Sequence, residues 1–410
     1  MSATTASPAR PGLSLWILLG LASLVMTLAM GLRQSLGLFQ TPLGTLGISA
    51  STFGFALALQ NIVWGASQPF VGALADRFGP RPVLVGTALT YAAGLLIMGE
   101  AGGAVGLGLG AGLLVGVGVA GTGFGVLLGV VSRAVPEHRR SRTVGAVAAT
   151  GSLGTALLAP LAQGLIGASG WRIAILVFAA IALVMAVLCL GIVERRAPAV
   201  TTASSDETLG QVLRQAMTHP GFLAMTAAFF ACGFQLVFIT SHLPAFLATC
   251  GIPASVSATA LGVVGLTNAV GTYVIGVLGG RFSQPKLLAL IYLLRTVAIA
   301  TYLALPITSA STLVFAGVLG LLWLGVTPLV SGIIGRLFGM RHFSTLFGIV
   351  FFSHQLGSFC GALLGGLSFD LTGSYSIAWA SLIAIGLVAF LLQWPMNDRP
   401  PALRRVPAVS

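Results

Sequence analysis

Apolar stretches separated by short polar connectors follow one another along almost the whole chain. A helix needs roughly 20 such residues to cross a bilayer, and each stretch is long enough to do so. The pattern predicts twelve membrane spans, at 14–39, 50–75, 82–100, 105–132, 142–168, 172–193, 220–247, 255–280, 286–306, 310–335, 343–368 and 375–396. Because this number is even, we expect both termini on the same side of the membrane.

The composition excludes a water-soluble globular protein. Of the 410 residues 56% are hydrophobic and only 7% are charged, and the mean hydropathy is +1.01, whereas soluble domains carry about a quarter charged residues. The net charge of +12 comes from basic residues spread over the connectors, so it does not indicate a nucleic-acid partner. The sequence therefore predicts an all-α polytopic protein in a lipid bilayer.

The basic residues also predict the orientation. If the termini are cytoplasmic, seventeen of the twenty basic residues lie inside: Arg10, Arg77, Arg81, Arg133, Arg139, Arg140, Arg142, Arg195, Arg196, Arg214, Arg281, Lys286, Arg336, Arg341, Arg399, Arg404 and Arg405. Only Arg172 then falls in an outer connector, which agrees with the positive-inside rule. The first span is too long for the apolar core of a cleaved signal peptide, so we expect it to stay.

One long polar stretch divides the spans into two groups of six. It predicts a tail at 1–13, a six-helix bundle at 14–193, a linker at 194–219, a second bundle at 220–396 and a tail at 397–410. The two groups repeat each other: Gly31 and Pro42 match Gly233 and Pro244 at an offset of 202, and Gly145 and Gly154 match Gly348 and Gly357 at 203. We therefore expect two parallel repeats of six helices.

A charged, glycine-containing motif joins the second and third spans: Gly72, Asp76, Arg77, Gly79 and Arg81. A weaker copy without the acid follows about 204 residues later, at 276–286. The motif resembles the signature between helices 2 and 3 of the major facilitator superfamily, and its copy falls at the family's counterpart between helices 8 and 9. The resemblance implies the major facilitator fold, a substrate site near mid-membrane between the halves, and a gate role for the motif. In that role Asp76 pairs with basic residues at the cytoplasmic helix ends.

Two further segments narrow the resemblance. Residues 136–151 with 170–172, and 342–373, are similar to the fifth-helix and eleventh-helix regions of monocarboxylate transporters and their bacterial relatives, including oxalate/formate exchangers. The likeness covers most of the chain and is specific for the branch rather than for one substrate. It implies a monomeric secondary transporter of a small organic anion in the bacterial inner membrane, working by alternating access.

Two arginines, Arg33 and Arg295, lie inside the predicted spans, and no carboxylate lies well inside any of them. Burying an arginine costs roughly 2.5 to 3.5 kcal/mol, and a guanidinium binds a carboxylate through two parallel hydrogen bonds. Arg33 is therefore the first candidate to bind an anion, and a basic residue at or next to this position in monocarboxylate transporters supports it. The alternatives are that Arg33 extends to the outer interface and that Arg295 bonds backbone carbonyls or a neighbouring helix.

Polar residues in the second span share one helical face. Gln60, Trp64 and Gln68 are spaced by four residues, with Asn61 beside them, so this face is expected to line a cavity or, alternatively, to bond a neighbouring helix. Further substrate-binding candidates are Gln34, Gln235, Asn268, Arg295, His354 and Gln355.

The means of energy coupling stays open at the level of sequence. The known monocarboxylate carriers have an Asp and, four residues on, an Arg in span eight, where this chain has Asn268 and Thr272. His354 is the remaining candidate for carrying a proton, because a histidine titrates near pH 6.5; the alternative is a packing role. His242 is expected at the outer interface. Both proton symport and exchange for a counter-anion are compatible with these residues.

Other functional classes find less support. Efflux of drugs or neutral solutes by proton antiport is the alternative within transport, but cationic drugs call for buried acids. A membrane enzyme would need paired acids, Gly-x-Ser-x-Gly or His-Glu-x-x-His inside the spans, and the sequence has none. The four cysteines are far apart and have no metal-type spacing. We expect neither catalysis nor a cofactor or metal.

Overall fold

The computed structural model describes residues 14–100, 103–135, 137–193, 208–339 and 343–396, and within these ranges the regular structure is entirely helical. The N-terminal half contains α1 (Leu15–Gln34), η1 (Leu36–Phe39), α2 (Gln40–Gly44), α3 (Ala50–Phe78), α4 (Pro80–Gly99), α5 (Ala104–Leu107), η2 (Gly108–Leu114), α6 (Val115–Thr122), α7 (Phe124–Ala134), α8 (Glu137–Ser169) and α9 (Trp171–Leu190). The C-terminal half contains α10 (Leu209–Thr218), α11 (Pro220–Thr249), α12 (Ala254–Gly279), α13 (Gln284–Ala304), α14 (Ser309–Leu321), α15 (Val326–Phe338), α16 (Phe343–Thr372) and α17 (Ser376–Gln393).

The helices account for every predicted span. Within the described residues, eleven helical segments are long and apolar enough to cross a membrane. The predicted span at 50–75 coincides with α3, which runs for 29 residues but has the amides Gln60, Asn61 and Gln68 in its middle. These polar side chains explain why α3 is less apolar than the other eleven. The predicted all-α polytopic fold is confirmed.

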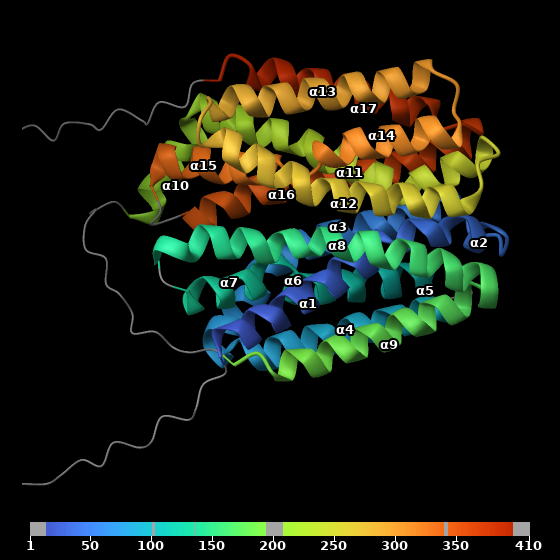
Figure 1. The fold of residues 1–410 in the computed structure, drawn as a ribbon, viewed down its shortest axis with the longest axis horizontal. Coiled ribbons are helices and arrows are strands. Elements are labelled where there is room, and N and C mark those ends of the chain that lie inside the picture. Colours follow the sequence, from blue (N-terminus) through green and yellow to red (C-terminus); the bar gives the residue numbers. More distant parts are fainter. Residues whose placement is uncertain (1–13, 101–102, 136, 194–207, 340–342, 397–410) are drawn as a thin grey trace, which may run out of the picture.

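The two halves lie side by side as two layers of roughly parallel helices (Figure 1). In this view α1 to α9 form the lower layer and α10 to α17 the upper one. Across the boundary α3 packs on α16 and α8 packs on α12. We call the end of the molecule near α2 the α2 end, and the opposite end, near α10, the α10 end.

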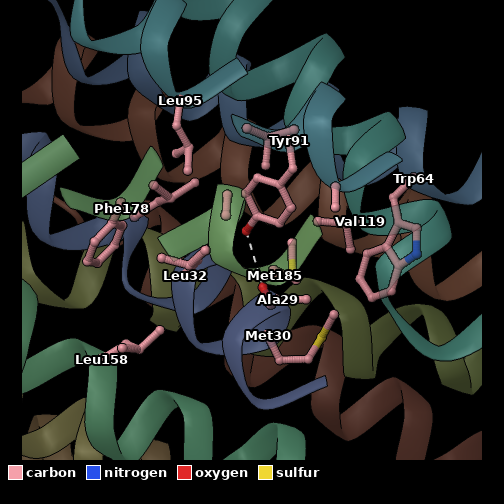
Figure 2. Close-up of a cluster of buried hydrophobic side chains, with 14 of the residues drawn as sticks. Ala29, Met30, Leu32, Trp64, Tyr91, Leu95, Val119, Leu158, Phe178 and Met185 are labelled. Carbon is pink, nitrogen blue, oxygen red and sulfur yellow. Dashed lines mark hydrogen bonds between the residues drawn. The ribbon is translucent and has the colours of Figure 1, made fainter. Parts of the chain in front are cut away.

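The molecule has two buried apolar clusters, one centred in each half, and the N-terminal one extends across the boundary to Val237, Ala258, Leu261 and Ala362. Figure 2 shows part of the N-terminal cluster, in which Tyr91 lies among Leu32, Leu95 and Val119. The Tyr91 hydroxyl donates to the carbonyl oxygen of Ala29 at 3.1 Å, so the one polar atom of this large buried side chain is satisfied. This core holds α1 and α4 together and supports the residues of α1 that reach the boundary between the halves.

The sequence repeat reappears as a repeated helix crossing. A Cβ atom on Gly154 of α8 would lie 1.9 Å from the carbonyl oxygen of Thr27 in α1. A Cβ atom on Gly357 of α16 would lie 2.0 Å from the carbonyl oxygen of Phe230 in α11. Both residues of the second pair follow those of the first by 203 positions. The same close backbone approach is therefore used in each half, and only glycine fits there.

The fourth and tenth spans are each interrupted near the middle. The fourth breaks at Gly123, between α6 and α7, and the tenth at 322–325, between α14 and α15. Glycines of the fourth span also pack closely on α4, since a Cβ on Gly110 would lie 2.6 Å from the carbonyl oxygen of Gly94. This is the close helix packing that the glycine-rich sequence indicates.

Candidate functional site

Arg33 lies near the C-terminal end of α1, where it faces the polar side of α3. Its Nη2 donates to Oδ1 of Asn61, and its guanidinium carbon lies 4.8 Å from the centroid of the Trp64 ring. The Trp64 ring is fixed in turn, because its Nε1 donates to Oε1 of Gln68 at 2.8 Å and the Phe351 ring meets it edge-on at 5.3 Å. The face of α3 that the residue spacing predicts is therefore brought against Arg33.

The C-terminal half reaches this group through Gln355 of α16. Gln355 donates from Nε2 to the backbone oxygen of Asn61 at 3.0 Å, which links the two halves. Its Oε1 lies 3.1 Å from Nδ1 of His354, whose ring lies 6.0 Å from that of Phe351 and nearly parallel to it. Arg33, Asn61, Trp64, His354 and Gln355 thus form one group at the boundary.

A small cavity of about 10 Å³ opens beside Arg33, enough for about one water molecule. Its lining comes from both halves: Arg33, Gly37, Leu57, Gln60, Asn61, Val237, Thr240 and Ser241. Among the described residues the lining includes no carboxylate. Nε of Arg33 is buried and has no hydrogen-bond partner in the described part of the chain. The guanidinium therefore keeps donor capacity that the surrounding protein does not use.

The other two candidates of the N-terminal half lie next to this group. Gln60 lines the cavity, and its Nε2 donates to the carbonyl oxygen of Ala111 in η2 at 2.8 Å. Gln34 is partly buried at the last position of α1.

Arg295 has a different environment, because it is fully buried inside the C-terminal half. Its Nη2 donates to the carbonyl oxygens of Leu322 at 2.6 Å and Trp323 at 2.9 Å, where α14 ends. Its Nη1 lies 3.4 Å from Oε1 of Gln235, whose Nε2 donates to the carbonyl oxygen of Leu382 at 3.0 Å. The structure brings Arg295 and Gln235 together, outside the cavity lining, and this arrangement favours a structural role for both.

Asn268 of α12 connects the same helix break to the other half. Its Nδ2 donates to Oγ of Ser152 in α8 at 2.7 Å, and its Oδ1 accepts from the backbone N–H of Leu324 at 2.9 Å and from Thr272 at 3.0 Å. Its side chain is thus engaged in holding helices together.

A second group at the boundary, which we call the α2-end cluster, consists of Gln40, His242, Asp370 and Tyr375. The His242 ring nitrogens lie 3.1 Å from Oε1 of Gln40 and 2.7 Å from the carbonyl oxygen of Ala362, and Nε2 of Gln40 donates to the Tyr375 hydroxyl at 3.0 Å. His242 is fully buried at this end of the boundary, and its expected depth at the outer interface of the membrane stays a prediction.

Sequence reasoning missed this cluster, although one signal could have found it. Gln40 and His242 are 202 positions apart, which is the offset of the repeat, so they occupy equivalent places in the two halves. Equivalent residues that face the partner half meet each other at the symmetry axis.

Asp370 completes the cluster from the end of α16. Its carboxylate accepts from the backbone N–H groups of Ala50 at 3.2 Å and Ser51 at 2.8 Å, the first residues of α3. A carboxylate is favourable at a helix N-terminus, where N–H groups have no partner within the helix. The halves are therefore held together at the α2 end by side chains from both sides.

The motif between the second and third spans forms a tight helix connection. Gly79 has φ of +88° and separates α3 from α4, a conformation that favours glycine, and Pro80 begins α4. The guanidinium of Arg77 lies 5.2 Å from the Phe78 ring centroid, while Gly72 and Arg81 lie on the flanking helices. The pairing expected for Asp76 concerns a side chain outside the described part of the structure, and it stays a prediction.

Comparison with known proteins decides the family. The family described as Major Facilitator Superfamily matches residues 14–330. The chain belongs to the major facilitator superfamily. This superfamily member is 28% identical over 387 residues to monocarboxylate transporter 13 of Rattus norvegicus, covering 92% of this chain and 86% of the relative. It is 24% identical over 399 residues to the oxalate:formate antiporter of Oxalobacter formigenes, and this match covers 94% of this chain and 93% of the relative.

A solved structure shares the fold of this superfamily member. It is the crystal structure of a bacterial homologue of the human lysosomal transporter Spinster, in an inward-facing and unoccupied conformation. The TM-score is 0.76 at 16% sequence identity, and the match covers 96% of this chain and all of the other. The likeness shows the common architecture of two helical halves.

Proposed function

We propose that the protein is a secondary active transporter that carries a small organic anion, in the first place a monocarboxylate, by alternating access of the two halves. The observation that carries the proposal is Arg33 beside a cavity at the boundary, with an unpaired Nε and no carboxylate in the described lining. Relatives named as monocarboxylate transporter and as oxalate:formate antiporter support this substrate class.

The surroundings of Arg33 suit one carboxylate. Asn61 holds Nη2 and Trp64 covers the guanidinium plane, so the orientation of the remaining donors is fixed before a substrate arrives. These donors can form two parallel hydrogen bonds to a carboxylate. Because the second intramembrane arginine is engaged by carbonyl oxygens inside the C-terminal half, the site offers one fixed positive charge.

The present conformation is closed around Arg33. A cavity of about 10 Å³ is too small for any organic anion, so the halves must move apart before binding. Rocking of one half against the other around a central site is the general mechanism of transporters with such repeats. Gln34, Gln60 and Gln355 are the polar residues that such a movement would bring into contact with substrate.

The orientation and the coupling belong to the same proposal. Following the positive-inside rule, both termini and the α10 end face the cytoplasm of a bacterial inner membrane, and the α2 end faces outward. Transport is coupled either to protons, with His354 as the residue carrying the proton, or to exchange for a counter-anion. The protein works as a monomer.

Efflux of drugs or neutral solutes by proton antiport is the alternative. Cationic drugs are bound by buried acids, and the described lining of the cavity offers an arginine instead. The anion proposal therefore gives the positive charge of Arg33 a binding partner, whereas a cationic or neutral substrate would leave this charge uncompensated.

Binding of matched ligands to the purified protein tests the substrate class. Lactate and lactamide differ in the carboxylate alone, and a ligand at 100 times its Kd stabilises the folded state by about 2.7 kcal/mol. We expect lactate to raise the Tm with increasing concentration, lactamide to have no effect, and Arg33→Gln to remove the response to lactate. Arg172→Gln, at an exposed position, is the matched control. Equal effects of acid and amide would overturn the proposal.

A further inference from the structure

We propose that His242 is a proton-binding site that controls the α2 end: a proton taken up by His242 separates the halves there, so that acid exposes the Arg33 site to the outside. The inference rests on the proposed function in taking the α2 end as outer. It assigns a chemical ligand, the proton, to a residue that sequence reasoning placed at the interface.

The hydrogen bonds of the ring define where the proton goes. The carbonyl oxygen of Ala362 can only accept, so Nε2, at 2.7 Å, must carry a hydrogen. Nδ1 is then the lone-pair nitrogen of a neutral ring, and it lies 3.1 Å from Oε1 of Gln40. Two acceptors do not bond each other, so the neutral ring requires the reverse orientation of the Gln40 amide, in which its NH₂ group donates to Nδ1 and its oxygen accepts from the Tyr375 hydroxyl. In that orientation the neutral ring is fully hydrogen-bonded in the closed arrangement, with Nδ1 as the atom that can take up a proton.

The packing around the ring disfavours a charge. His242 is 0% exposed, and its carbon edges fit against two glycines, one in each half. A Cβ on Gly365 would lie 2.2 Å from Cδ2, and one on Gly54 would lie 3.3 Å from Cε1. The described titratable groups around the ring are Asp370 of α16 and Tyr375 of the following connector, while α2 and α3 approach through the uncharged Gln40 and Gly54. Asp370 already accepts two backbone N–H groups, so the ring has no carboxylate bonded to it. Burial of an unpaired charge is costly, and the closed cluster therefore holds the ring neutral.

Separation of the halves changes these surroundings in one step. Gln40 and Gly54 belong to the N-terminal half, whereas His242, Ala362 and Gly365 belong to the C-terminal half. Opening removes the partner of Nδ1 and one wall of the ring, but it leaves the bond from Nε2 to Ala362 in place. A hydrated histidine titrates near pH 6.5.

Acid is expected to favour opening of the α2 end. The open arrangement binds a proton at Nδ1 from the outer solution and the closed one does not, so acid favours opening. Well above pH 6.5 the closed arrangement has its full advantage. Below it, each further pH unit shifts the equilibrium toward opening by up to about tenfold, since one proton is bound.

Accessibility of a cysteine introduced behind the cluster tests the inference without any substrate. Thr240 lines the cavity, so the Thr240→Cys variant can be labelled from the outside of intact cells with a membrane-impermeant methanethiosulfonate. The native Cys250 is exposed and corrects for the effect of pH on the reagent. We expect the labelling at position 240, relative to that of Cys250, to rise several-fold between pH 7.5 and 5.5, with the rise beginning near pH 6.5.

Two variants, each made in the Thr240→Cys background, address the ring itself. His242→Gln keeps a polar side chain that cannot take up a proton, so the rise should vanish. Gln40→Glu keeps the ring and offers it a carboxylate across the boundary, which should hold the cluster closed in acid and also suppress the rise.

His354→Gln is the control, and it should leave the rise in labelling intact. A rise that persists in His242→Gln, disappears in His354→Gln, or is absent in the parent would overturn the inference. Because no anion is present, failure of lactate binding would refute the proposed substrate class separately.

Discussion

At the scale of single residues, the two intramembrane arginines show how partners decide a role. Arg33 has one side-chain acceptor, one aromatic ring and a buried Nε without a partner among the described residues. Nε of Arg295 is likewise buried without a partner among the described residues, but Arg295 directs Nη2 at two carbonyl oxygens and Nη1 at an amide within its own half. The first is suited to a substrate carboxylate and the second to holding a helix break.

Lysine at position 33 should weaken binding without abolishing it. Arg33→Lys keeps the charge but loses the planar pair of donors, and the loss of one charge-assisted hydrogen bond costs about 1.5 to 3 kcal/mol. We expect the Kd for lactate to rise about tenfold or more, and Arg33→Gln to abolish binding, as measured by the shift of Tm with ligand concentration. An equal Kd for lactate in the Arg33→Lys variant and the parent would show that the site recognises charge alone.

Removal of Arg295 should affect stability rather than recognition. Arg295→Met leaves the carbonyl oxygens of Leu322 and Trp323 unpaired in the core, and each buried unpaired group costs about 1 to 3 kcal/mol. We expect a clearly lower Tm in detergent, with lactate still stabilising the folded fraction. A normal Tm together with lost binding would place Arg295 in the substrate site instead.

Sequence and structure agree best where the pattern is local. The spacing of Gln60, Trp64 and Gln68 on one helix was enough to predict a polar face, and Arg33 meets it. For Arg295 the sequence left substrate binding and bonding to backbone carbonyls as alternatives. It could not decide between them, because the carbonyl oxygens are exposed by a break in a different helix. The burial of His242 depends on Gly54 and Gly365, which only the assembled halves bring to the ring.

At the scale of elements, repeated glycines set the helix crossings. Gly154 and Gly357 stand where α8 meets α1 and α16 meets α11, and a side chain at either would collide with a carbonyl oxygen. Gly145 and Gly348, the other repeated pair in the same helices, have no heavy atom within 4 Å of an added Cβ. The sequence repeat identified all four but could not separate the packed pair from the open one.

Alanine substitutions should separate these two pairs. Gly154→Ala and Gly357→Ala overpack a backbone contact, which typically costs about 1 to 3 kcal/mol. Gly145→Ala and Gly348→Ala should be neutral or stabilising by up to about 1 kcal/mol, because alanine favours a helix. Thermal unfolding of the four variants in detergent measures the difference. Equal Tm values for all four would contradict the close crossings.

At the scale of the whole molecule, the two halves meet at a boundary that carries both the group around Arg33 and the α2-end cluster. The fold class and the repeat could be predicted from hydrophobic pattern and spacing, because each span is a local signal. The conformation could not be predicted from the sequence, because it depends on which end of the boundary holds the two halves in contact. In this structure that is the α2 end, where Gln40 meets His242 and Asp370 accepts from the first residues of α3.

Asp370→Asn should loosen this end at neutral pH. It removes the negative charge at the N-terminus of α3 but keeps one acceptor oxygen, and such a charge contributes about 0.3 to 1 kcal/mol at an exposed site. In the Thr240→Cys background, we expect labelling at position 240 at pH 7.5 to rise by about two- to fivefold. Glu100→Gln, which removes the charge of an exposed residue after α4, is the control and should have no effect. Unchanged labelling in Asp370→Asn would show that this contact does not hold the halves together.

Transport itself tests the central claim most directly. Uptake of labelled lactate, pyruvate, formate and oxalate into liposomes carrying the purified protein is measured with and without an inward proton gradient, for the parent, Arg33→Gln and Arg172→Gln. Our account predicts saturable uptake of a monocarboxylate by the parent and Arg172→Gln and its loss in Arg33→Gln, with the gradient deciding between symport and exchange. No saturable uptake of any anion, or undiminished uptake by Arg33→Gln, would contradict it.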